Sequence, residues 1–99
     1  MARKSDFIDI QNSVALTLNN VSYEQYGEAK KNLKSAIEKL LAVRKAVDRQ
    51  DTATLYDMES VGVSLGKAFT LLNKKPESLR IKPHLEEAIG TLKKIQSRL

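Results

Sequence analysis

Residues 55–72 read LYDMESVGVSLGKAFTLL, and the rest of the chain is organised around them. Apolar residues recur here at steps of three and four, which is the spacing of one helical face. The stripe consists of Leu55, Met58, Val61, Gly62, Leu65, Ala68, Phe69 and Leu72. We therefore predict a central helix over residues 52–73, with Leu65 and Phe69 buried against neighbouring helices. Gly62 and Gly66 predict either a close approach of two backbones or a groove open to a partner.

The composition is typical of one globular domain spanning residues 1–99. Hydrophobic residues make up 41% of the chain and charged residues 29%, which is ordinary for such a domain. The chain has no Cys, and no apolar run is long enough for a signal peptide or a membrane span. We therefore expect a cytoplasmic protein without a membrane span.

Two helices are predicted before the central one. The first covers residues 6–19, is capped by Ser5 or Asp6, and ends at the pair Asn19-Asn20. Its stripe consists of Phe7, Ile10, Val14, Leu18 and Val21. The second covers residues 23–49, where Ser22 and Gln25 have the spacing of a capping box. Its stripe consists of Tyr26, Ala29, Leu33, Ala36, Ile37, Leu40, Val43 and Val47.

The boundary between the second helix and the central one has two interpretations. No Gly or Pro occurs between Arg44 and Leu55, and the two stripes stay nearly in phase. One continuous helix of about fifty residues is therefore possible, and it would suit a dimer that exchanges long helices. The polar run over residues 48–52 favours a break near residue 50, because it contains good N-cap residues.

The last helix is predicted over residues 84–98, after a long connection over residues 75–83. Residues before Pro76 and Pro83 are pushed out of helical geometry, and Pro83 suits a first helical position. We expect Leu79 and Ile81 to pack back against the bundle. The fold class is therefore all-α, an antiparallel four-helix bundle of unequal helices.

No pattern of catalytic or metal-binding residues is present. Glu86 and Glu87 are adjacent on a predicted helix and point apart, so they suit its N-terminal end rather than acid–base chemistry. His84 is the only His, and one His without Cys or a carboxylate cluster does not make a metal site. We expect neither an enzyme nor a bound cofactor.

A basic face is predicted on the second helix. Its members Lys31, Lys34, Lys45 and Arg49 fall within about 60° on a helical wheel. They could neutralise successive phosphates of a nucleic acid or another polyanion, or form a solvated surface. Glu38 lies within this face and would repel phosphate, and no aromatic residue accompanies it for base stacking.

Large apolar residues also lie off the predicted stripes. They are Tyr56, Val63 and Leu71 in the central helix, and Ile8 and Leu16 in the first. A second apolar set needs either internal packing or a partner surface, and a homo-oligomer is the simplest partner. The sequence therefore predicts a non-enzymatic protein–protein interaction module, such as an adaptor, a small subunit of an assembly, or an inhibitor or immunity-type factor. A nucleic-acid-binding protein is the alternative. The candidate binding residues are Lys31, Lys34, Lys45, Arg49, Tyr56 and Val63.

Overall fold

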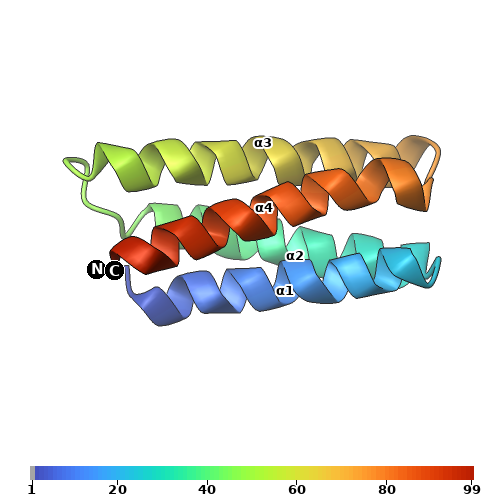
Figure 1. The fold of residues 1–99 in the computed structure, drawn as a ribbon, viewed down its shortest axis with the longest axis horizontal. Coiled ribbons are helices and arrows are strands. Elements are labelled where there is room, and N and C mark those ends of the chain that lie inside the picture. Colours follow the sequence, from blue (N-terminus) through green and yellow to red (C-terminus); the bar gives the residue numbers. More distant parts are fainter. Residues whose placement is uncertain (1) are drawn as a thin grey trace.

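The computed structural model describes residues 2–99, whose helices are α1 (Lys4–Ser22), α2 (Tyr26–Arg44), α3 (Thr52–Lys74) and α4 (Ser78–Arg98). Successive helices run antiparallel (Figure 1). α1 packs against α2 and α4, and α3 packs against the same two, so α1 and α3 lie diagonally opposite. Residues 2–99 contain no strand. The predicted antiparallel four-helix bundle is confirmed.

One face of each helix is buried, and these faces form a single core. Fully buried side chains include Phe7 and Ile10 of α1, Leu33 of α2, Leu65 of α3, and Leu85 and Leu92 of α4. Burying a side chain of this size contributes about 1.5–3 kcal/mol. The four sides of the bundle are unequal, because α2 and α3 pack on each other less than any other neighbouring pair.

Both bounds of α3 lie within one residue of the predicted ones, but the buried face of the helix differs from the predicted apolar stripe. Thr54, Asp57 and Ser64 are buried, whereas Phe69 is only half-buried. At about 100° per residue, the buried face is centred roughly 45° from the predicted apolar stripe. The predicted burial of Leu65 is confirmed, and the full burial of Phe69 is wrong.

The turn between α1 and α2 lies three residues later than predicted on both sides. Asn20 is buried, and its side-chain Nδ2 donates to Gln25 Oε1 at 3.1 Å while its side-chain Oδ1 accepts from Asn32 Nδ2 at 2.7 Å. These bonds keep Asn20 within α1. Glu24 adopts the left-handed conformation instead, with φ of 57°. Ser22 therefore ends α1 and does not cap α2.

Residues 45–51 connect α2 to α3, so the predicted break is confirmed and the single continuous helix is wrong. α2 ends at Arg44, five residues before its predicted end, and the amides of Ala46 and Val47 donate to carbonyls three residues back rather than four. Further along the connection, Asp48 Oδ1 accepts from the Gln50 N–H at 2.9 Å. Asp51 caps α3 by accepting from the Thr54 N–H at 3.2 Å. Hydrogen bonds from the Thr54 side chain and backbone lower the pKa of Asp51.

α4 begins at Ser78, six residues before its predicted start, and it contains Pro83. A proline there removes one helical hydrogen bond, to the carbonyl of Leu79. Ile81 and Leu85, on either side of Pro83, are fully buried. Their packing keeps the first turns helical despite the proline. Leu79 is 85% exposed, so its predicted packing is wrong, while that of Ile81 is confirmed.

The close approach of two backbones predicted at Gly62 and Gly66 is wrong, whereas a groove open to a partner stays a prediction, with Gly66 lining a hollow beside Thr70 and His84. A Cβ added at Gly66 would meet nothing within 4 Å, and one at Gly62 would lie 3.7 Å from Leu40 Cδ2, which is an ordinary contact. The helices therefore have room for a methyl group at both positions.

We expect Gly66→Ala and Gly90→Ala each to raise the free energy of unfolding by about 0.5–1 kcal/mol, since alanine costs less backbone entropy in a helix. Both glycines are exposed, and an added Cβ at either has no close neighbour. Urea denaturation followed by circular dichroism measures the change. A loss of stability at Gly66 alone would contradict the open space around it.

Candidate interaction surfaces

The predicted basic residues do not share one helical face. Lys31 and Lys34 are exposed on α2, but Lys45 follows its last residue and Arg49 lies in the connection to α3. The predicted face is wrong because α2 ends at Arg44. The chain nevertheless brings Lys45 and Arg49 together in a groove to which Lys31 and Lys34 do not contribute.

This groove lies between the C-terminal end of α2 and the start of α3, and we call it the α2–α3 groove. Its volume is about 640 Å³, and its lining consists of Leu41, Arg44, Lys45, Val47, Arg49 and Leu55. Leu41 is 54% exposed, while Val47 and Leu55 are half-buried. The groove therefore combines accessible apolar surface with several cationic side chains.

The cations of the groove are not neutralised within the bundle. Arg44, Lys45 and Arg49 are exposed, and none of them forms an ion pair with any residue in the range 2–99. The groove lining contains no carboxylate. Asp48, which follows Val47, instead accepts a hydrogen bond from the Gln50 N–H. The groove is therefore electropositive.

A second candidate is the outward side of α1, which we call the α1 outer face. It consists of Ile8, Asn12, Ala15, Leu16 and Asn19 of α1 together with Tyr23, which directly follows the helix, all of them exposed. At about 100° per residue these positions fall within a sector of roughly 100°. Leu16 is 50% exposed and Tyr23 is 71% exposed. The predicted apolar excess on α1 therefore faces solvent and is not used in internal packing.

The α1 outer face is uncharged, although the chain is rich in charge. No Asp, Glu, Lys or Arg occurs between Ile10 and Tyr23. Asp9 borders the face and is paired with Lys39 at 3.2 Å. The other helices expose charged side chains, among them Glu28, Lys31, Lys34 and Glu38 on α2, and Glu86, Glu87, Lys93 and Lys94 on α4. Charge depletion thus distinguishes this side of the bundle.

The predicted residues Tyr56 and Val63 are also exposed, by 74% and 52%. They lie on α3, diagonally opposite α1. Leu71, the third apolar residue off the predicted stripe of α3, is half-buried and packs against the core. Of the two predicted alternatives for this residue, internal packing is confirmed and a partner surface is not needed. Glu59 and Lys67 are exposed on the same helix. The surface of α3 is therefore less apolar than the α1 outer face.

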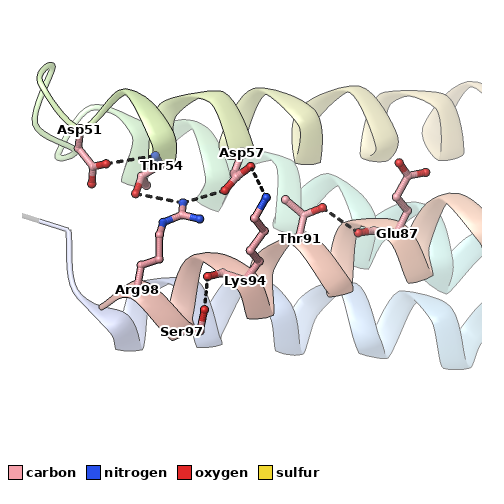
Figure 2. Close-up of polar contacts among 8 residues, drawn as sticks. All are labelled: Asp51, Thr54, Asp57, Glu87, Thr91, Lys94, Ser97 and Arg98. Atoms are coloured by element: carbon pink, nitrogen blue, oxygen red, sulfur yellow. Dashed lines mark hydrogen bonds and ion pairs between the residues drawn. The ribbon is translucent and has the colours of Figure 1, made fainter.

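Asp57 is a buried acid that links α3 to α4 (Figure 2). Arg98 Nη2 donates to Asp57 Oδ2 at 2.7 Å, and Lys94 Nζ lies 3.7 Å from Oδ1. Arg98 also reaches Thr54 Oγ1 at 3.5 Å. The Asp57 side chain is 8% exposed. These contacts neutralise the acid and fix the last turn of α4 beside the first turns of α3.

Sequence reasoning missed several of these residues. Leu41 was assigned to no face, although it directly follows the stripe residue Leu40 and must therefore point elsewhere. Ile8 and Leu16 were predicted to lie off the stripe, but the uncharged positions between them were not connected with them. The absence of charge between Ile10 and Tyr23 is the signal that would have revealed the whole face.

Comparison with protein-family models, with curated proteins and with solved structures finds no match to this chain. None of the helices α1–α4 is long and apolar enough to cross a membrane. Over the same described residues, no group of at least three His, Asp or Glu side chains is placed to hold a metal ion.

Proposed function

We propose that the protein is a non-enzymatic protein–protein interaction module, which works as a homo-oligomer and binds an acidic, apolar segment of a partner protein in the α2–α3 groove. The observation that carries this proposal is the cluster of Arg44, Lys45 and Arg49 around accessible Leu41. Helical segments of partner proteins commonly bind by laying an apolar face into such a groove.

The apolar part of the groove favours a peptide over a bare anion. Leu41 exposes 54% of its surface, and Val47 and Leu55 lie beside it in the lining. An apolar side chain placed there gains free energy by leaving water, at about 25 cal/mol for each Å² buried. The volume of about 640 Å³ accommodates a few large side chains.

The cations favour an acidic sequence around that apolar side chain. Arg44, Lys45 and Arg49 have no partner among the described carboxylates, so acidic groups of a ligand need not displace an internal ion pair. Complementary charge across an interface speeds encounter and selects among partners. An amphipathic segment with Asp or Glu beside Leu, Ile or Phe has both properties.

The nucleic-acid alternative has weaker support. Lys31 and Lys34 lie on α2 outside the groove, and Glu38 is exposed on the same helix. A phosphate backbone needs cations at successive positions, and it has no use for apolar surface between them. The groove residues therefore favour a protein partner.

A selection from a random peptide library tests the proposal. We expect the wild-type chain to enrich peptides that combine acidic with large apolar residues. The chain has no Trp, so the fluorescence of a Trp built into a selected peptide reports its burial directly. The triple variant Arg44→Gln, Lys45→Gln, Arg49→Gln should bind that peptide about tenfold more weakly, since exposed ion pairs contribute about 0.2–1 kcal/mol each.

A matched control removes the same charge elsewhere. Lys31→Gln, Lys34→Gln, Lys93→Gln changes exposed residues that do not line the groove, so peptide affinity should change less than about twofold. Equal losses in both triple variants would contradict a specific groove. So would enriched peptides without acidic residues, or a DNA oligonucleotide that binds the groove more tightly than any selected peptide.

A further inference from the structure

We infer that the α1 outer face binds the same face of a second copy of the chain, with the two α1 helices antiparallel and a two-fold axis passing between Ala15 and Leu16. This inference specifies the homo-oligomer of the proposed function and rests on that part of it. It does not depend on the α2–α3 groove.

The exposed residues along α1 have the spacing that a two-fold contact requires. If two α1 helices meet antiparallel about an axis between positions 15 and 16, Ala15 lies opposite Leu16, Asn12 opposite Asn19, and Ile8 opposite Tyr23. All six positions are exposed in the single chain. Each residue of the face thus meets another residue of the same face, as an isologous contact requires.

Each of these pairs is chemically matched. Leu16 is large and 50% exposed, and the small side chain of Ala15 leaves room for it. Asn12 and Asn19 each carry an amide that both donates and accepts, so they can hydrogen-bond to each other. Ile8 and Tyr23 combine an aliphatic and an aromatic side chain, and the Tyr hydroxyl remains at the edge, where water can reach it.

The lack of charge on this face lets a second copy approach there without like-charge repulsion across the contact. The protein carries a net charge of +5, so two copies repel each other at most relative orientations. The α1 outer face has no charged residue, and Asp9 at its border is already paired with Lys39. Depletion of charge, with aromatic and large apolar residues remaining, is the compositional mark of an interface core.

The size of the face indicates a reversible dimer. From Ile8 to Tyr23 the face is roughly 23 Å long and one helix wide. A standard interface buries about 800 Å² on each partner, so the flanks of α2 and α4 must contribute, and contacts below that size are typically transient. We therefore expect dissociation in the micromolar range.

Cysteine cross-linking tests both the face and the register. The chain has no Cys, so introduced residues are its only thiols. In the double variant Asn12→Cys, Asn19→Cys, the two cysteines of one chain are roughly 10 Å apart along α1, too far for an internal disulfide. In the dimer each faces its counterpart. We expect a covalent dimer under mild oxidation or with a short bismaleimide, and little dimer from either single variant.

The matched control has the same spacing on the opposite helix. Tyr56→Cys, Val63→Cys places two exposed cysteines seven residues apart on α3. It should cross-link no more than the single variants. Dimer formed by this pair and not by the α1 pair would overturn the inference and assign self-association to α3. Equal cross-linking by the single and double α1 variants would overturn the register.

Sedimentation equilibrium gives an independent readout. Leu16→Glu would bring two carboxylates together at the two-fold axis, so we expect the dimer dissociation constant to rise at least about tenfold. Val63→Glu, an equally exposed position, should leave the dissociation constant unchanged. A monomer of 11.1 kDa for the wild type throughout the micromolar range would overturn the inference. Leu16→Glu should still bind the selected peptide, because Leu16 does not line the α2–α3 groove. Failure of the dimer can therefore be distinguished from failure of the groove.

Discussion

Replacing Leu65 by alanine is expected to lower the free energy of unfolding by about 3–5 kcal/mol, because the side chain is fully buried and its loss leaves a cavity. Leu65 lies near the middle of α3, where neither end of the bundle can relax into the gap. A domain of this size has a total stability of about 5–15 kcal/mol, so the variant should melt well below the wild type. Urea denaturation followed by circular dichroism measures the difference.

Leu79→Ala provides the control for this result. It makes the same chemical change on α4, where the side chain is 85% exposed, and should change stability by less than about 0.5 kcal/mol. Similar effects at Leu65 and Leu79 would show that the buried face of α3 is wrongly assigned.

Replacing Asp57 by alanine is expected to cost about 2–3 kcal/mol, because it removes the acceptor for Arg98 and the charge that faces Lys94. The loss should stay below that of a fully buried ion pair, since Arg98 is 32% exposed and water can solvate it in the variant. Chemical denaturation of Asp57→Ala, Arg98→Ala and the double variant measures the coupling free energy between the two side chains.

Glu59→Ala is the matched control, because it removes an exposed carboxylate two residues along the same helix. Its effect should lie within about 0.5 kcal/mol. Additive effects of the two single changes at Asp57 and Arg98 would contradict a direct interaction between them.

The contrast between Leu65 and Asp57 explains how much of the fold could be predicted. Apolar spacing alone identified the helices and the position of Leu65, because that spacing is a local property of the chain. The burial of Asp57 depends on Arg98, 41 residues away, and no local pattern reports it. The predicted stripe contains only apolar residues and Gly62, so it omits the buried Thr54, Asp57 and Ser64 and is centred nearer to Phe69.

Pro83 illustrates a second limit. Local preference sets a helix start at or just before a proline, and the prediction followed it. The burial of Ile81 and Leu85 outweighs the missing hydrogen bond, so α4 begins at Ser78, well over one turn earlier than predicted. Tertiary packing of this kind becomes visible only once the partner helices are in place.

The residues of the candidate surfaces were predicted well where a local pattern identifies them, and badly where they depend on how the chain turns. Tyr56, Val63 and Leu16 were identified from their positions off the stripes, which are local, but those positions left open whether the side chains pack internally or are exposed, as the structure has them. Lys45 and Arg49 were grouped on one helical face that does not exist. They line one groove because α2 ends at Arg44 and the chain turns over residues 45–51 before α3 begins.

The weak packing between α2 and α3 has a consequence for motion. The bundle consists of two hairpins, α1–α2 and α3–α4, which are joined closely along α1 and α4 and loosely along α2 and α3. Local unfolding should therefore begin in the turns of α2 and α3 that face each other, at a lower free energy than global unfolding. In a hydrogen-exchange experiment, backbone amides of α2 and α3 should then exchange faster than backbone amides of α1 and α4.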